Sequence, residues 1–296
     1  MNIKTLFSAF AILAVSLNCV SAQGGSLTPP PGVPAPTMRA LDEVEPRIPI
    51  TELPYTISES GSYIITGPLA STGHGIVVQA HNVTIDLMGF TITGANHANF
   101  HGILAQGGEG IPLRNVHIRN GGVQNFGDGV RFENVNGGSI QHLTAIQNVG
   151  RGMHMRSLSA PGNTSANVII EHCLVIDNGA VGITLDGNAG IARGFVIRHN
   201  SIQGNLGMGI RIDRGEGCVV TDNMIGPQVP DINDFAYAIF NYQTVRSLFV
   251  RNISIDNATG MALAGVRGFI IAKQFGNLSD TGIESHPMAN FHIRND

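Results

Sequence analysis

The sequence predicts an all-β protein, a single-stranded right-handed parallel β-helix (a solenoid) with an N-terminal cap. One observation behind this prediction is a recurring five-residue unit that opens on glycine and alternates apolar with mostly polar residues. Another is its spacing, since 27 residues separate Gly75 from Gly102, and again Gly102 from Gly129. A third is that two further short apolar stretches follow most of the units. Three short strands per repeat, with no repeat able to bury its apolar face alone, are typical of a parallel β-helix, and parallel crossovers are right-handed.

The glycine-led units differ in strength but keep one pattern. They are Gly75-Ile-Val-Val-Gln, Gly102-Ile-Leu-Ala-Gln, Gly129-Val-Arg-Phe-Glu, Gly152-Met-His-Met-Arg, Gly182-Ile-Thr-Leu-Asp, Gly209-Ile-Arg-Ile-Asp and, more weakly, Ala238-Ile-Phe-Asn-Tyr and Gly260-Met-Ala-Leu-Ala. An unbroken series of this kind favours one elongated domain over two small ones.

Composition agrees with this fold and excludes some functions. The 296 residues include 38 Gly and no Trp, 43% are hydrophobic and only 13% are charged. Such a composition suits many short strands and turns, and it argues against both disorder and a helical bundle. The formal net charge of −4 and the pI of about 6.2 provide no electrostatic footprint for nucleic acid.

The N-terminus has the pattern of a secretory signal peptide over residues 1–22. Lys4 supplies the positive charge, residues 6–17 the apolar core, and Val20-Ser-Ala the small residues before a cleavage site at Gln23. We therefore expect a secreted, periplasmic or cell-surface protein that is not inserted in a membrane once the signal is removed. An N-terminal anchor is the alternative. Residues 23–49 are rich in proline and predict an extended linker.

The remaining chain is expected to hold a cap and the β-helix. Residues 50–72 are assigned to the N-terminal cap, with strands at Tyr55-Thr-Ile and Ser62-Tyr-Ile-Ile-Thr. A cap is expected because the end of a solenoid exposes its core and its strand edges. Residues 73–296 are assigned to the parallel β-helix with a C-terminal cap.

Asparagine recurs at one position of the repeats. Asn200, Asn223, Asn252 and, at the same place in its own repeat, Cys173 follow the second strand. Asparagine suits bends between strands, so stacked coils should set these side chains in an internal ladder. Cys173 and Cys218 are expected to be small buried residues, because two cysteines are too few for a disulfide framework.

The repeats resemble those of the right-handed parallel β-helix repeat proteins of bacteria, which are related in architecture to pectate lyases. Glu45-Pro-Arg-Ile-Pro-Ile through Gly61-Ser-Tyr-Ile-Ile-Thr-Gly-Pro-Leu is similar to their N-terminal cap, and Asn82-Val-Thr-Ile-Asp-Leu-Met-Gly-Phe-Thr-Ile to their first coil. The resemblance covers about residues 40–296. It implies the β-helix fold, which hosts lyases, hydrolases, epimerases and adhesins. It also implies that polysaccharide is bound in a groove on the outer face of one sheet.

Strand alternation divides each glycine-led unit into inward and outward positions. The inward positions are all apolar: Ile76, Val78, Ile103, Ala105, Val130, Phe132, Met153, Met155, Ile183, Leu185, Ile210 and Ile212. The outward positions are apolar or neutral at both ends of the series. Four central coils instead carry Arg131, Glu133, His154, Arg156, Thr184, Asp186, Arg211 and Asp213. Because adjacent coils lie about 4.8 Å apart, we expect one contiguous polar patch.

The polar patch has two interpretations. Glu133, Arg156 and Asp186 alternate in sign along one column, as in a solvated salt-bridge ladder that has no function. Asp186 and Asp213, however, are stacked like charges, which is unfavourable unless arginines, a substrate or a cation such as Ca²⁺ compensates them. No other cofactor is indicated, and the histidines and cysteines show no metal-ligand spacing.

We expect the patch to serve an exported polysaccharide-active protein, with a lyase or epimerase acting on a uronate-containing, acidic glycan as the first hypothesis. Arg131, Arg156 or Arg211 would neutralise the uronate carboxylate. His154, which is expected to face solvent from its outward position, would then abstract the neighbouring proton, with Tyr242 or a carboxylate as partner.

The remaining patch residues allow other chemistry as well. Glu133 and Thr184 are assigned to substrate binding, whereas Asp186 and Asp213 are candidate catalytic carboxylates that as a pair would suit hydrolysis. The alternative from another class is a non-catalytic carbohydrate-binding, adhesive or structural β-helix at the cell surface.

Overall fold

A computed structural model describes residues 47–108, 110–157, 165–187, 191–232 and 236–257, and the backbone of the four strands that follow. The described residues form 29 strands. They form no helix, and therefore no helix long and apolar enough to span a membrane. The expected signal peptide and nearly all of the expected linker lie outside the described residues.

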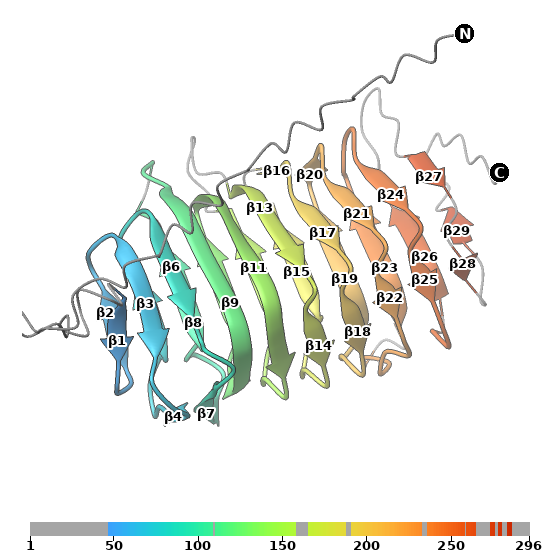
Figure 1. Ribbon diagram of the computed structural model, residues 1–296. Coiled ribbons are helices and arrows are strands. Elements are labelled where there is room, and N and C mark those ends of the chain that lie inside the picture. Colours follow the sequence, from blue (N-terminus) through green and yellow to red (C-terminus); the bar gives the residue numbers. More distant parts are fainter. Residues whose placement is uncertain are drawn as a thin grey trace, which may run out of the picture. The chain divides into compact units, whose positions relative to one another are not determined.

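The strands pair in parallel in two sheets, and successive coils stack upon one another (Figure 1). The ten-stranded sheet holds the glycine-led units: β2 (Tyr55–Ile57), β5 (Ile76–Val78), β8 (Ile103–Gln106), β10 (Val130–Glu133), β12 (Met153–Arg156), β15 (Ile183–Asp186), β19 (Met208–Asp213), β23 (Tyr237–Tyr242), β26 (Thr259–Ala264) and β29 (Ile283–Ser285). Within each coil the chain leaves this sheet, passes through the second one and returns one coil further on.

The second sheet has 19 strands and receives the two later strands of each coil. Its members are β1 (Ile48–Ile50), β3 (Gly61–Ile65), β4 (Leu69–Ala70), β6 (Val83–Asp86), β7 (Thr91–His97), β9 (Leu113–Phe126), β11 (Val135–Ile146), β13 (Ala166–Glu171), β14 (Leu174–Ile176), β16 (Ala192–Arg193), β17 (Val196–Arg198), β18 (Ser201–Gln203), β20 (Gly215–Glu216), β21 (Val219–Thr221), β22 (Met224–Ile225), β24 (Leu248–Val250), β25 (Ile253–Ser254), β27 (Lys273–Phe275) and β28 (Leu278–Ser279). The predicted fold, a right-handed parallel β-helix, is confirmed.

The register places the same position of successive repeats side by side. Val130 pairs with Met153, Met153 with Ile183, and Ile183 with Ile210. All twelve predicted inward residues have 0% of their surface exposed. Glycine opens the units because the coils are closely stacked: a Cβ atom at Gly182 would lie 2.7 Å from a backbone oxygen of the next coil.

The stretch expected as an N-terminal cap continues both sheets. Strand β2 pairs in parallel with β5, and β3 with β6, so residues 55–65 form the first coil of the stack. Strand β1 pairs with β3 and begins at Ile48, inside the stretch expected to be linker. The ordered fold therefore begins slightly earlier than the composition of the chain indicates.

The predicted asparagine ladder is present inside the second sheet's turns. Asn200 Nδ2 donates to Asn223 Oδ1 and Asn223 Nδ2 to Asn252 Oδ1, both at 2.9 Å. Cys173 extends the ladder through its backbone amide, which donates to Asn200 Oδ1 at 3.0 Å. Cys173 and Cys218 are free and buried, as predicted, and burial raises the pKa of Cys173 to about 12.

A second ladder, not predicted, lies at the turns that lead into the ten-stranded sheet. It consists of Asn148, Asn178, Asn205, Gln228 and Asn257. The backbone N–H of each of the first four donates a hydrogen bond to the side-chain amide oxygen of the next one. These amides satisfy backbone groups that leave the sheets at the bends. They hold the outer face of the ten-stranded sheet, where the polar patch lies, at a constant position from coil to coil.

Candidate functional site

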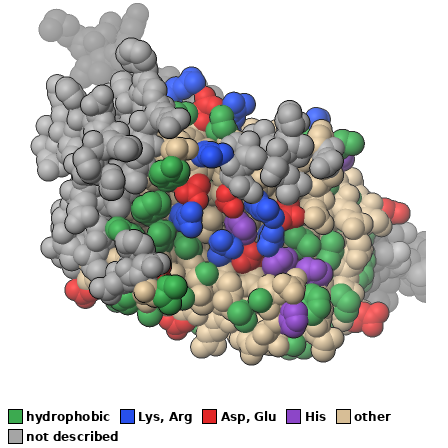
Figure 2. All heavy atoms as spheres, turned by 180° about the vertical axis from the view of Figure 1, so that it is seen from behind, with side chains coloured by type: hydrophobic (Ala, Val, Ile, Leu, Met, Phe, Trp, Pro, Cys, Tyr) green, Lys and Arg blue, Asp and Glu red, His purple; other side chains and the backbone are tan. Residues whose placement is uncertain are grey.

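A pocket of about 310 Å³ opens on the outer face of the ten-stranded sheet. Four successive coils line it, with the residues Arg151, Thr184, Asp186, Arg211, Asp213, Arg214 and Tyr242. Charged and histidine side chains gather on this face of the molecule (Figure 2). Outward positions of neighbouring strands meet here because the strands are in parallel register, as for Asp186 beside Asp213 and Asp213 beside Tyr242.

The structure divides the predicted patch into two parts. Thr184, Asp186, Arg211, Asp213 and Tyr242 line the pocket. The other predicted substrate-binding residues, Arg131, Glu133 and Arg156, form a separate ion-pair cluster on the N-terminal side. His154 lies between these two groups.

In the ion-pair cluster, Glu133 is the shared acceptor. Arg131 donates to Glu133 Oε1 through Nε at 2.9 Å and Nη2 at 2.6 Å, and Arg156 Nη1 lies 3.3 Å from the same oxygen. Gln106 Nε2 donates to Glu133 Oε2 at 2.9 Å. Burial by itself would raise the pKa of Glu133, but the two arginines lower it below its usual value. Glu133 lies at an outward position of its strand, yet these side chains cover it and leave it 5% exposed.

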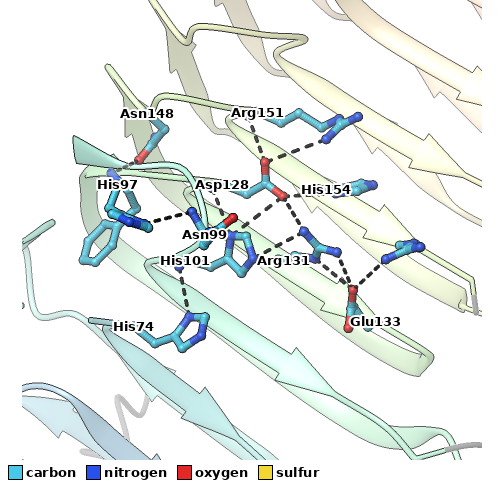
Figure 3. Close-up of polar contacts among 12 residues, drawn as sticks. His74, His97, Asn99, His101, Asp128, Arg131, Glu133, Asn148, Arg151 and His154 are labelled. Carbon is cyan, nitrogen blue, oxygen red and sulfur yellow. Dashed lines mark hydrogen bonds and ion pairs between the residues drawn. The ribbon is translucent and has the colours of Figure 1, made fainter. Parts of the chain in front are cut away.

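His154 is buried as well, which corrects the expectation of a solvent-exposed histidine. It points outward from its strand, yet only 3% of the residue is exposed. Its Nδ1 lies 3.1 Å from Asp128 Oδ2, and its Nε2 lies 3.7 Å from Asp186 Oδ2 (Figure 3 shows the first contact). Two carboxylates therefore flank the ring, one on each side.

Asp128 is a buried carboxylate at the centre of a network that sequence analysis missed (Figure 3). Its carboxylate lies 3.1 Å from His154 Nδ1, and it accepts hydrogen bonds from the backbone amide of Arg151 at 3.0 Å and from Arg131 Nη1 at 3.4 Å. Burial alone would raise the pKa of Asp128, but the hydrogen bond and charge of His154, the Arg151 amide and the charge of His101 hold it well below its ordinary value. Asp128 is thus a fixed negative charge at neutral pH.

The contact with Asp128 sets the tautomer of a neutral His154. Because Asp128 is ionised and accepts only, Nδ1 carries the proton and Nε2 has the free lone pair. Nε2 then faces Asp186 Oδ2 at 3.7 Å. Because the Nε2 lone pair and the carboxylate oxygen both accept hydrogen bonds, a proton or a donor group of a ligand is needed between them. The geometry suits a group that takes up a proton on the side of the pocket.

Buried polar atoms without a hydrogen-bond partner concentrate at this site. Among the described residues they are Arg151 Nε, His154 Nε2, Thr184 Oγ1, Arg211 Nε and Asp213 Oδ1, together with atoms of Asn241 and Thr244 elsewhere. The first five belong to residues that line the pocket or, for His154, adjoin it. Native structures leave few such atoms unsatisfied, so ordered water or a polar ligand is expected beside them.

Most of the site residues that were not predicted from the sequence occupy the position just before a unit's glycine, whereas Arg214, which also lines the pocket, follows β19. This column holds His74, His101, Asp128 and Arg151. It is linked by side chains that accept from the next coil's backbone: His101 N donates to His74 Nδ1 at 3.0 Å, and Asp128 N to His101 Nδ1 at 3.1 Å. The sequence does contain a sign of this column, because four successive repeats carry a polar residue at this position. The column lies outside the glycine-led units from which the site was predicted.

An arginine compensates one of the two like charges that stack at Asp186 and Asp213. Arg211 Nη2 lies 2.7 Å from Asp213 Oδ2. Among the described residues no group of three or more His, Cys, Asp or Glu side chains is arranged to hold a metal ion. The ion pair compensates the charge of Asp213, as one of the possibilities that the sequence left open beside a substrate or Ca²⁺.

We expect His101 to make the stability of the protein depend on pH. Burial lowers the pKa of His101 to about 4, and the charge of Asp128 opposes this only in part. In the unfolded chain a histidine titrates near pH ~6.5. Between about pH 6.5 and 4 the unfolded chain therefore binds a proton that the folded chain does not, so the free energy of unfolding falls as the pH is lowered through this window.

The variant His101→Gln should remove this part of the dependence, because the glutamine oxygen can still accept the Asp128 amide but does not titrate. Urea unfolding at several pH values between about 4 and 7 measures it. An unchanged slope would assign the dependence to His74 and His117, whose pKa values burial also lowers.

Comparison with known proteins agrees with the fold. The family described as right handed beta helix region matches residues 60–225, which is more than half of the chain, and the protein belongs to it. No curated protein matches the chain.

Solved structures of the same architecture include the Agl-KA catalytic domain, with 13% identity and a TM-score of 0.55 over 81% of this chain and 49% of that one. The enzymatically active domain of bacteriophage CBA120 tailspike protein 2 has 12% identity and a TM-score of 0.52, over 81% of this chain and 38% of that one. A double mutant of the periplasmic alginate epimerase AlgG has 12% identity and a TM-score of 0.48, over 81% and 76%. The chain thus spans about half or less of the first two domains, and likeness at these identities shows the fold alone.

Proposed function

We propose that this chain is an exported enzyme that acts on a uronate-containing polysaccharide by proton transfer at the carbon next to the carboxylate, as a lyase or an epimerase. The observation that carries the proposal is the cluster of unpartnered buried polar atoms around one pocket. Leaving such atoms unsatisfied costs free energy, which a polar ligand would recover. Export rests on the signal-peptide pattern of residues 1–22.

Arg151 and Arg211 are the groups suited to hold the carboxylate. Arg151 has a buried Nε without a partner, and its Nη1 is 4.0 Å from the nearest Asp128 oxygen, which is a loose contact. Arg211 also has a free Nε, while its Nη2 is held by Asp213. A planar guanidinium binds carboxylate in a bidentate manner, and neutralising the carboxylate stabilises the negative charge that develops when the neighbouring proton leaves.

Asp186 and His154 are the groups suited to take that proton. Asp186 lines the pocket and its side chain is 26% exposed, whereas His154 lies beneath it and does not line the pocket itself. In this arrangement Asp186 accepts the proton, His154 Nε2 shares it, and the Asp128 charge stabilises the resulting imidazolium. His154 thus acts through Asp186, rather than as the exposed base that sequence analysis proposed.

The remaining step depends on the reaction. In a lyase the electron pair of the broken C–H bond forms a C=C bond and expels the glycosidic oxygen, which needs a proton. In an epimerase a proton returns to the same carbon from the other face. Tyr242 lines the pocket two coils beyond Asp186, is 39% exposed and suits either role.

Hydrolysis is the second candidate, because Asp186 and Asp213 are direct register partners on adjacent strands. Their nominal separation of about 4.8 Å is near the ~5–5.5 Å typical of retaining glycosidases. Against this, Arg211 Nη2 holds Asp213 Oδ2 at 2.7 Å, so the Asp213 carboxylate is already engaged in an ion pair.

The test is a panel of uronate-containing and neutral glycans incubated with the purified protein. Ultraviolet absorbance of unsaturated product reports a lyase, solvent-deuterium incorporation an epimerase, and reducing ends without absorbance a hydrolase. We expect one of the first two signals on a uronate glycan, and a loss of about 10²-fold in kcat/KM for Arg151→Gln. Binding of glycans without any turnover would instead identify the non-catalytic carbohydrate-binding β-helix.

A further inference from the structure

The pocket extends along the stack of coils. Its lining residues come from four consecutive coils: Arg151 precedes β12, Thr184 and Asp186 lie on β15, Arg211 and Asp213 on β19, and Tyr242 on β23. Strands lie about 4.8 Å apart, which is comparable to the length of one hexose in an extended glycan. A linear glycan lying along the stack therefore presents about one sugar to each coil.

The centre of this path has the charge to bind one carboxylate. Three arginines and two aspartates line the pocket, which leaves one positive charge in excess when His154 is neutral. Arg211 is already engaged with Asp213. Arg151, whose Nε is buried without a partner, is the cation best placed to receive a ligand.

On the N-terminal side of the pocket, the arginines that the described strands β10 and β12 carry have no positive charge to spare. Arg131 and Arg156 both contact Glu133, and Arg131 also contacts Asp128. Two arginines thus face two buried carboxylates. Beyond them the outward column continues with Gln106, which is bound to Glu133, and Leu104, which is neutral. A second uronate on this side would meet arginines that are already neutralised.

The last of the four coils, on the C-terminal side, carries aromatic side chains on β23. Phe240 lies directly beside Arg211, and Tyr242 directly beside Asp213. The ring of Tyr237 is 5.6 Å from that of Phe240. Aromatic faces pack well against the apolar C–H faces of sugars but offer no compensation for a carboxylate, and the nearby Asp213 is itself negative.

We infer that the site is built for a heteropolysaccharide in which a uronate is flanked by neutral sugars, and not for a homopolymer of uronates. The inference rests on the proposed function and adds the charge pattern of its substrate. One carboxylate is received at the pocket, and the coils on either side accept uncharged units.

The first experiment compares three classes of glycan at one ionic strength, because binding of anionic polymers depends strongly on salt. The classes are homopolyuronates (alginate, polygalacturonate), alternating uronate–N-acetylhexosamine glycans (hyaluronan, heparosan), and carboxyl-reduced forms of the latter. We expect an alternating glycan to bind at least about tenfold more tightly than either homopolyuronate, and the carboxyl-reduced form to lose that binding.

The second experiment releases the neutralised arginines. Glu133→Gln keeps the shape of the side chain but removes the negative charge that Arg131 and Arg156 share, and it leaves Arg131 with the Asp128 carboxylate alone. Binding of homopolyuronates should therefore improve about tenfold relative to alternating glycans. Glu216→Gln is the matched control, because Glu216 is also held by two arginines, Arg193 at 2.8 Å and Arg246 at 2.7 Å, but in the other sheet. It should leave the selectivity unchanged.

The outcomes separate this inference from the proposed function. Homopolyuronates that bind as well as or better than alternating glycans would overturn the inference while the proposed function stands. If no uronate glycan binds more tightly than its carboxyl-reduced form, the proposed function itself fails. Should Glu133→Gln not fold, as judged by circular dichroism, the comparison of glycans on the unaltered protein decides alone.

Discussion

Replacing Ile210 with aspartate is expected to prevent folding. Ile210 has no exposed surface and stacks between Ile183 and Ile239 of the adjacent coils. An unpaired carboxyl group there has no hydrogen-bond partner, and burying it costs several kcal/mol even if it is protonated. Since a domain is stable by only about 5–15 kcal/mol in total, and every coil depends on its neighbours, loss of this layer should be decisive.

Soluble yield, circular dichroism and urea unfolding measure the effect. The matched control is Ile232→Asp, because the same substitution at a residue that is 99% exposed should change stability by less than about 0.5 kcal/mol. A folded Ile210→Asp protein with a cooperative transition like that of the control would show that the inward positions tolerate charge, and the assigned register would have to be abandoned.

The fold could be predicted because the constraint is repeated. Each glycine-led unit places two apolar residues inward, and a shift of one residue would turn those of every unit to solvent. Six units with the same alternation leave one register, and the structure has that register from Ile76 to Ile212. The asparagine ladder followed from the same periodicity.

The site could be predicted only in part, because it depends on which outward side chains pair with one another. Strand alternation placed Asp186 and Asp213 side by side, and the structure agrees. It could not show that Glu133 would be enclosed by Arg131 and Arg156, since that depends on side-chain conformation. Sequence analysis therefore expected these arginines to receive a substrate.

The side-chain directions of residues in turns could not be predicted from the sequence either. Asp128 and Arg151 precede their strands, where backbone bends and not alternation decide the direction of the side chain. In the structure the turn brings Asp128 under His154 and Arg151 to the rim of the pocket. In this chain the column before the glycine therefore contributes to the candidate site together with the strand positions.

The last prediction concerns His154, whose loss is expected to lower kcat by ~10²–10⁴-fold, the range for removing a group that takes part in proton transfer. His154→Asn is the informative variant, because its amide can still donate to Asp128 as Nδ1 does, but it cannot take up a proton. His154→Ala removes the donor as well and leaves Asp128 buried with one partner fewer, which should also cost ~1–3 kcal/mol of stability.

If His154 transfers protons, both variants are equally inactive when assayed well below their unfolding temperatures. Activity retained in His154→Asn but lost in His154→Ala would reduce the histidine to a structural support of Asp128.

Asp128→Asn tests the positioning role in the same assay. It should lower kcat with little change in KM, because Asp128 orients His154 from beneath and does not line the pocket. A rise in KM alone would instead place Asp128 in substrate binding, through its contacts with Arg131 and Arg151.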